Sequence, residues 1–306
     1  MNGKNRSSVT EFVLLGLSDR PEQQSLLFTS FLFIYLLALF GNVLIMMVIA
    51  LSPQLHHPMY LFISALNTVD IGLISATVPK MLTNIYTSKK SISYTDCIAQ
   101  LLFFVFFATA ECVLLAVMAY DRYVAICFPL RYPVIMKTCV CLWMVTSAFV
   151  VSFLHALLHT LLLAGLPFCG PNQILHYFCD IAALLKLSCV RTSTNELIIF
   201  TEGSLVVMLP FSAVLFSYVC IVVAILKIHS TEGRHRAFST CSSHLTVVIL
   251  FYGTLVFMYF RPSSSYSLSQ EKFVTVMYNV LAPTLNPFIY SLRNSEVKNS
   301  LRKLTS

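Results

Sequence analysis

The feature that most limits the fold of this chain is a long stretch without charge. Between Glu22 and Asp70 the sequence contains no Asp, Glu, Lys or Arg. A charged side chain is costly in lipid, and the interior of a soluble domain is too small to keep so long an uncharged run from water. Of the 306 residues, 57% are hydrophobic and 11% are charged, whereas soluble domains have about 45–50% and about 25%. The chain is therefore predicted to be a membrane protein.

Seven apolar segments are long enough to cross a bilayer, which takes about 20 residues of α-helix. We predict an all-α membrane protein, a seven-transmembrane helix bundle with a short C-terminal amphipathic helix. The tail is expected over 1–23, the bundle over 24–292, and the cytoplasmic amphipathic helix over 293–306. No cleavable signal peptide is evident, so the first helix is expected to act as an uncleaved signal. The predicted spans are 24–51, 58–81, 98–127, 139–165, 197–228, 237–260 and 270–292.

The orientation of the chain is indicated by its glycosylation sequon and its cysteines. Asn5 begins the sequon "NRS" in the polar tail, which favours an extracellular N-terminus. The Lys and Arg residues do not decide the orientation, because they divide equally between the two sides. They lie scattered in short loops, so the net charge of +7 indicates a membrane surface rather than nucleic acid.

Four cysteines gather on the face that carries the sequon. Cys97 begins the third helix, and Cys169, Cys179 and Cys189 lie in the loop between the fourth and fifth helices. This arrangement is typical of disulfides in an oxidising compartment, with free thiols as the alternative.

Several long motifs resemble one receptor family. They include "MAYDRYVAICFPLRYP", "HHPMYLFISALNTVDIG", "VPKML", "RAFSTCSSHLTVV" and "PTLNPFIYSLRN". Seven spans with "DRY" at the end of the third resemble the rhodopsin-like G-protein-coupled receptors, and the longer strings resemble the class II (terrestrial-type) odorant receptors. "LNTVDIG" departs from the more common "LSFVDIC", a change that bears on ligand choice rather than on the fold. The resemblance implies a protein that spans the plasma membrane and contacts membrane lipid. Its implied partners are small volatile odorants as ligands and the olfactory stimulatory G protein.

The resemblance also implies a switch and two disulfides. Arg122 would pair with Asp121 at rest and be released on activation, a bistable element that a ligand biases. The alternative is an ion pair that only anchors the end of a helix. The implied disulfides are Cys97–Cys179 and Cys169–Cys189. The full set of expected switch residues is Asp121, Arg122, Tyr123, Tyr218, Arg236, Asn286, Pro287 and Tyr290.

Two acids fall at matching depths within the bundle. The resemblance places Asp70 beside Asn286 in a polar cavity, and Glu111 lies at the same level on the third helix. Two carboxyl groups this close repel each other when both are ionised, which costs free energy. We therefore expect either a sodium ion between the acids or one shared proton. The alternative is a water-filled network without a switching role.

The ligand is expected in the outer half of the bundle, among residues carried over mostly from the resemblance. Such an apolar lining with few polar groups suits small, mostly apolar molecules, although any one of these residues could simply pack helix against helix. The expected ligand-binding residues are Phe104, Val105, Ala108, Thr109, Cys112, Glu202, Gly203, Val206, Tyr252, Leu255, Val256, Tyr259 and Asn279.

Three other functions compete with a receptor. A metal ion would suit His155 and His159, one turn apart, or His176 beside Cys179, but the implied disulfide uses Cys179 and we predict no metal site. A channel or transporter would need a polar path through the membrane, which scattered acids do not supply. An intramembrane hydrolase would need a nucleophile with a base, and no G-x-S-x-G or H-E-x-x-H motif is present. We therefore predict a receptor and not an enzyme.

Overall fold

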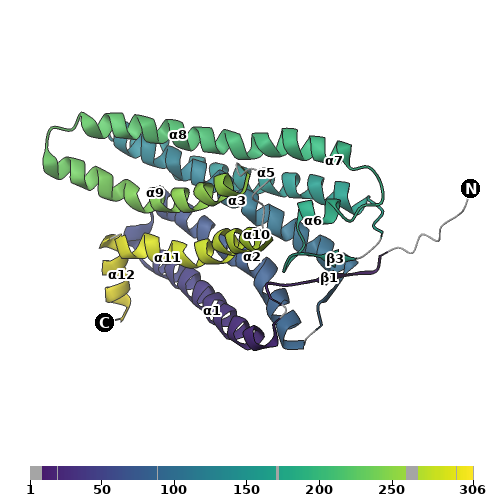
Figure 1. The fold of residues 1–306 in the computed structure, drawn as a ribbon. Helices are drawn as coiled ribbons and strands as arrows, with labels where there is room; N and C mark the ends of the chain where they lie inside the picture. The colour runs from purple at the N-terminus through teal and green to yellow at the C-terminus, as the bar shows by residue number, and fades with distance from the viewer. Residues whose placement is uncertain are drawn as a thin grey trace, which may run out of the picture.

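The computed structural model describes residues 9–18, 20–87, 89–169, 172–259, 268–293 and 295–305. It is a bundle of long helices with a small sheet at one end (Figure 1). The helices that build the bundle are α1 (Pro21–Leu51), α2 (Pro58–Thr87), α3 (Tyr94–Cys127), α5 (Thr138–Ala164), α7 (Ser193–Ile198), α8 (Ser204–Leu226), α9 (Thr231–Tyr259), α10 (Leu268–Val276) and α11 (Ala282–Arg293). The shorter helices are η1 (Pro53–Leu55), α4 (Tyr132–Ile135), α6 (Ile181–Leu185) and α12 (Ser295–Thr305), and two π-helical turns, η2 (Ile199–Gly203) and η4 (Met277–Leu281), join α7 to α8 and α10 to α11.

Each predicted span overlaps one of these helices or helical segments, and most of the helices begin a few residues before the predicted span. In the described part of the chain, five helices are long and apolar enough to cross a membrane, and α9 adds an apolar stretch over Cys241–Leu255. Helix α9 begins at Thr231, before the start of the predicted span 237–260. Hydropathy marks only the part of a helix that lies in lipid, whereas the backbone hydrogen bonds continue into water.

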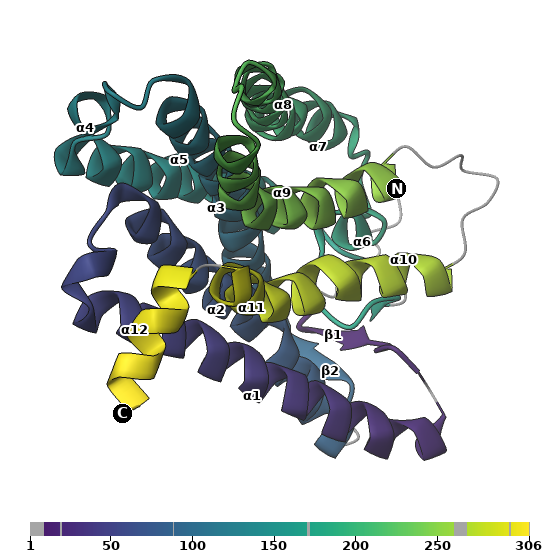
Figure 2. The same ribbon diagram turned by 90° about the vertical axis from the view of Figure 1, so that its left-hand side faces the viewer.

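Helix α3 lies at the centre of the bundle. It packs against α2, α5 and α8 and also contacts α9, and the two ribbon views agree on this arrangement (Figures 1 and 2). Two pairs of helices, α2 with α3 and α1 with α11, approach each other closely at a glycine. A Cβ atom at Gly72 of α2 would lie 2.3 Å from the ring of Phe107, and one at Gly41 of α1 would lie 3.1 Å from Cγ of Pro287 in α11. Glycine at these positions lets the helices pack closely.

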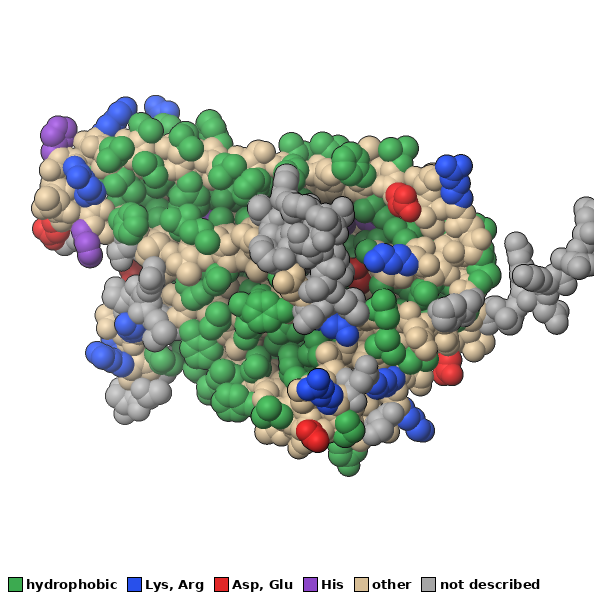
Figure 3. Space-filling view, viewed as in Figure 1, with side chains coloured by type: hydrophobic (Ala, Val, Ile, Leu, Met, Phe, Trp, Pro, Cys, Tyr) green, Lys and Arg blue, Asp and Glu red, His purple; other side chains and the backbone are tan. Residues whose placement is uncertain are grey.

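The outer surface of the bundle is apolar. Large hydrophobic side chains such as Phe33, Phe40 and Trp143 are each about two-thirds exposed, at 66%, 65% and 69%. On the face drawn in Figure 3, hydrophobic side chains cover much of the surface and charged side chains gather toward its ends. In water such a surface would be unfavourable, whereas in a bilayer it contacts lipid.

A three-stranded sheet closes one end of the bundle, which was not predicted. Strand β1 (Glu11–Leu14) pairs antiparallel with β2 (Ser91–Ser93) and parallel with β3 (Gln173–Ile174). Phe12 and Leu14 of β1 are buried in the core. The tail therefore folds back onto the bundle, and Gly16, with φ of 72°, supplies the left-handed turn that follows β1.

At the opposite end, α12 lies across the helix ends as the predicted amphipathic helix (Figure 2). Val297 is buried, whereas Lys298 and Arg302 are exposed. The hydroxyl of Tyr60 in α2 donates a 2.7 Å hydrogen bond to Oε2 of Glu296, which ties α12 to the bundle. We call this the α12 end and the sheet-bearing end the disulfide end.

Candidate functional site

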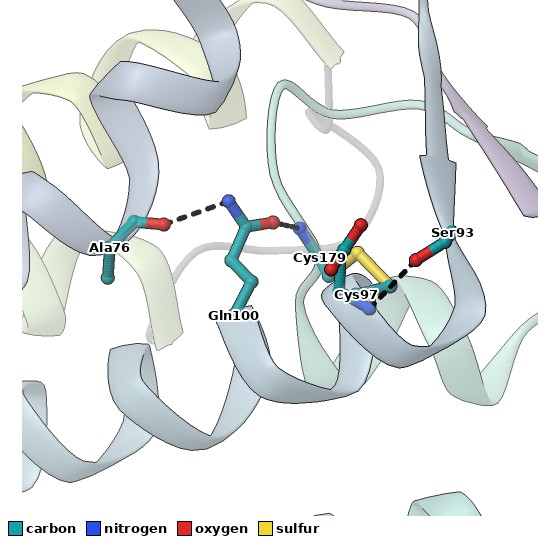
Figure 4. Close-up of a disulfide and its surroundings, with 6 residues drawn as sticks. Ala76, Ser93, Cys97, Gln100 and Cys179 are labelled. Atoms are coloured by element: carbon teal, nitrogen blue, oxygen red, sulfur yellow. Dashed lines mark hydrogen bonds between the residues drawn. A yellow bond between two sulfur atoms is a disulfide. The ribbon is translucent and has the colours of Figure 1, made fainter.

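Two disulfides fix the loop at the disulfide end, in the pairing that the sequence resemblance implied. Cys97 joins Cys179 and Cys169 joins Cys189, with Cα–Cα distances of 5.6 and 5.4 Å. Beside the first bridge, Gln100 donates to the carbonyl of Ala76 (2.9 Å) and accepts from the backbone N–H of Cys179 (2.9 Å; Figure 4). This glutamine, which sequence reasoning missed, joins α2, α3 and the loop.

The loop places three aromatic rings over the bundle. The ring of Phe178 lies 4.7 Å from that of Phe104 in α3. His176 packs against Tyr177 and Phe178 with ring centroids 4.7 and 4.6 Å away. Burial, with a smaller contribution from the charge of Lys272, lowers the pKa of His176 to about 3. His176 is therefore neutral at ordinary pH and acts as a packing residue of the loop.

Part of the expected ligand site comes together beneath this loop. Sγ of Cys112 in α3 lies 3.2 Å from the hydroxyl of Tyr252 in α9 and 4.0 Å from the carbonyl oxygen of Val206 in α8. Val105 and Thr109 are buried on the same helix as Cys112. Ala108, Gly203 and Leu255 are only partly buried, and the side chains of Val256 and Tyr259 lie outside the described residues.

The amide nitrogen of Asn279 in η4 already has two hydrogen-bond partners. Its Nδ2 donates to the hydroxyls of Thr77 and Tyr177, each at 3.2 Å. Its oxygen Oδ1 is buried without a hydrogen-bond partner among the described residues. A ligand that reached this amide would therefore have to donate a hydrogen bond to Oδ1.

Glu202, expected in the ligand site, bonds to α5 instead. Nδ1 of His155 and Nε2 of His159 lie 2.8 Å from its two carboxylate oxygens. From the sequence, His155 and His159 were considered as metal ligands but no metal site was predicted, and Glu202 was placed in the ligand site. Nothing in the order of the sequence linked Glu202 to the two histidines. In the described part of the chain, their ligand atoms all lie within 4.8 Å of one another, as a metal ion requires.

The polar core predicted between the second and third helices is present. Nδ2 of Asn286 donates to both carboxylate oxygens of Asp70, at 3.0 and 3.1 Å. Glu111 is fully buried, and neither of its oxygens has a hydrogen-bond partner among the described residues. Asn67 is also buried nearby in α2, and its amide has no hydrogen-bond partner in the described part of the chain. A buried polar atom without a partner is costly, and a water molecule, a cation or a proton on a carboxyl group would relieve that cost here.

At the α12 end, the "DRY" residues form the expected ion pair. Nη2 of Arg122 lies 3.4 Å from Oδ2 of Asp121, and both side chains are buried. Tyr132 in α4 donates a 2.7 Å hydrogen bond to Oδ1 of the same aspartate, a contact that sequence reasoning did not find. Burial, and then the negative charge of Asp121, raise the pKa of Tyr132 far above its usual value, so this hydroxyl remains a donor.

The other expected switch residues lie around this pair. Tyr218 bonds to His244 rather than to Arg122, and the hydroxyl of Tyr290 is buried without a partner among the described residues. The ring of Tyr123 packs edge-on against Phe128, with centroids 5.6 Å apart. The side chain of Arg236, like the sequon residue Asn5, lies outside the described residues.

Comparison with known proteins identifies the family. The model of the olfactory receptor family matches residues 31–306 of the chain. Olfactory receptor 1J4 of Homo sapiens is 53% identical over 99% of this chain and 97% of its own length. Olfactory receptor 1G1 of Gorilla gorilla gorilla is 51% identical over the same shares, and human olfactory receptor 1J2 is 51% identical over 100% of this chain and 98% of its own length.

The chain belongs to the olfactory receptor family. Its members are seven-helix, multi-pass membrane receptors that detect odorants through G proteins, and they are not enzymes. These comparisons confirm the predicted membership in the odorant receptor family and the predicted seven-helix fold.

Proposed function

We propose that this olfactory receptor detects small, neutral, mostly apolar volatile molecules in the disulfide-end half of its bundle. The observation that carries the proposal is that, among the described residues, the acid Glu202 and the base Lys272 are both bonded within the protein. Glu202 is held by His155 and His159, and Lys272 donates to the carbonyl of Gly16. The remaining wall is aromatic and aliphatic, with hydroxyl, thiol and amide groups.

Charge and hydration then set the ligand class. A carboxylate would lose its water at a cost of several kcal/mol and gain no counter-charge from Glu202 or from Lys272. A neutral molecule could hydrogen-bond to Thr109 or Asn279 and bury its carbon skeleton. Each buried methylene contributes about 0.8 kcal/mol, so ligands of roughly eight to twelve carbons could reach micromolar affinity despite the cost of association. Alcohols, aldehydes, ketones and esters of this size are the proposed agonists, with alcohols favoured at the free acceptor of Asn279.

We assign the signalling step to the α12 end. Ligand binding at α3 would shift the bundle between two packings, and Arg122 would leave Asp121 to contact a stimulatory-type G protein. This proposal orients the disulfide end and the N-terminus outside the plasma membrane, because disulfides form in oxidising compartments. A sodium ion or one shared proton at Asp70 and Glu111 would hold the resting packing.

The test is a cyclic AMP assay in transfected cells with a series of ligands in which each carboxylic acid is matched to its aldehyde, alcohol and ester. The neutral members should be the more potent in every set. Thr109→Val should lower the potency of oxygenated ligands by about 2- to 10-fold, the worth of one hydrogen bond. Thr83→Val is the matched control, since that hydroxyl bonds to the carbonyl of Pro79 on an exposed face. If the acids are consistently the most potent, the ligand site has been assigned wrongly.

A further inference from the structure

Three side chains that the receptor mechanism does not use converge where α5 meets η2. His155 and His159 lie one turn apart on α5, with ring centroids 4.5 Å apart. Glu202 reaches both from η2, with N–O distances of 2.8 Å to each ring. Two imidazoles and one carboxylate are the donor set of many three-ligand zinc sites, in which the fourth position is left to water.

The backbone of each element brings these donors together. Residues i and i+4 of an α-helix share a face, so both imidazoles point from α5 in the same direction. Glu202 lies in a π-helical turn, which contains one residue more than an α-helical turn and re-aims the side chains that follow it. Such turns are frequent at functional sites.

Burial of the three residues suits a held ion. The side chain of His159 is 2% exposed and that of His155 is 11% exposed, whereas Glu202 is 34% exposed. The two imidazoles are thus held in place by the residues around them. The partly exposed carboxylate of Glu202 leaves a path by which an ion could enter the site. His159 lies five residues before the end of α5 at Ala164, or about 8 Å along the helix axis. The path of an ion from that end of the helix to the site is therefore short.

We propose that His155, His159 and Glu202 bind one divalent zinc ion. Each ring would adopt the tautomer that turns its proton away from Glu202, so that Nδ1 of His155 and Nε2 of His159 become ligands. Zinc–ligand distances of about 2.0–2.2 Å require the donor atoms to separate slightly from their present hydrogen-bonding distances, which changes of side-chain rotamer supply. The ion would bridge α5 to the segment α7–η2–α8 and resist their movement during activation.

A hydrogen-bonded network without metal is the competing explanation, and one substitution separates the two. Glutamine at position 202 can still hydrogen-bond to both imidazoles, but it is a far poorer zinc ligand than a carboxylate. Glu202→Gln should therefore remove zinc binding while leaving the metal-free receptor about as stable as before. If the network is purely structural, zinc will have no effect on either protein.

The experiment uses the purified full-length receptor in detergent, with zinc ion as the probe and a fluorescent chelator as the competitor. The wild type should bind one zinc ion tightly, and its melting temperature should rise on zinc addition. Glu202→Gln and His155→Asn should each weaken this binding by at least about 10-fold and abolish the rise in melting temperature, since loss even of outer-shell partners costs about 10- to 100-fold. The second variant decides the matter if the first fails to fold.

The control is the double variant His56→Asn, His57→Asn, which removes an exposed histidine pair near η1. It should retain the tight site, because that pair lies outside the proposed cluster. The proposal is overturned if the wild type has no tight zinc site, or if its zinc binding survives both test variants, whether or not this control loses it. Neither result depends on an odorant, so the test is independent of the ligand class proposed above.

Discussion

The hydroxyl of Tyr218 in α8 lies 2.7 Å from Nδ1 of His244 in α9, and the two rings are nearly parallel, at 7°. Nε2 of the same histidine lies 3.1 Å from the carbonyl oxygen of Leu115 in α3. Because a carbonyl can only accept, Nε2 carries the proton and a neutral ring accepts from Tyr218 at Nδ1. His244 thus joins three helices near the α12 end, within two turns of Arg122 along α3.

Replacing this histidine should loosen the α12 end. His244→Phe keeps an aromatic ring but removes both hydrogen bonds, so we expect the free energy of unfolding to fall by about 1–3 kcal/mol. Tyr218→Phe removes only one of the two and should cost about 0.5–1.5 kcal/mol. Thermal unfolding of the purified variants measures both. Equal melting temperatures for His244→Phe and wild type would show that the bridge contributes nothing to stability.

Arg122 and Asp121 should give opposite signalling phenotypes. Arg122→Ala removes the cation proposed to contact the G protein and should abolish cyclic AMP signalling at unchanged surface level. Asp121→Asn weakens the 3.4 Å ion pair and should raise signalling without ligand. Tyr132→Phe, which leaves that pair in place, should raise it less. The measurement is cyclic AMP normalised to surface expression, and full signalling by Arg122→Ala would contradict the proposed switch.

The polar core should respond to sodium. Within the part of the chain that the structure describes, the two buried oxygens of Glu111 have no hydrogen-bond partner, and Asp70 is bonded to Asn286. If a sodium ion completes this site, replacing sodium by potassium should lower the melting temperature of the wild type but not of Glu111→Gln. If the two proteins respond alike to the exchange of sodium for potassium, and Glu111→Gln melts at a higher temperature than the wild type, a shared proton accounts for the pair instead. Ser217, buried in α8, offers the control Ser217→Ala, which should keep the sodium response.

The loop at the disulfide end should open in acid. The pKa of His176 is about 3 in the folded loop against an ordinary value of 6.5, so the open loop binds more protons between these values. Closure is therefore fully stable above pH 6.5 and weakens as the pH falls, by about 2 kcal/mol between pH 6.5 and about pH 5. The stability of loop closure is measured by backbone hydrogen exchange of residues 172–180 at pH 6.5 and at about pH 5. His176→Gln, which does not titrate, should remove most of the dependence, and an equal response in this variant would refute the assignment.

Local sequence patterns were sufficient for the helices and for part of the site. Hydropathy over about 20 residues identifies a span because each membrane helix satisfies its own backbone hydrogen bonds. The pairing of Arg122 with its chain neighbour Asp121 followed from the resemblance carried by the "DRY" motif. Motif resemblance supplied the disulfide partners of Cys97 and Cys169 and the contact of Asp70 with Asn286, which spacing alone left open.

Contacts between distant segments were decided by the tertiary structure. The pairing of β1 with β2 and β3, the bridge from Gln100 to Cys179, and the bond from Tyr132 to Asp121 depend on how loops fold back onto the bundle. The approach of Glu202 to His155 and His159 depends on the rotation of α5 and on a π-helical turn. Hydropathy fixes which segments enter the membrane but not how each helix is rotated about its axis, because lipid is as apolar as the helix interfaces. Side-chain packing sets that rotation, and with it the polar groups that meet inside the bundle.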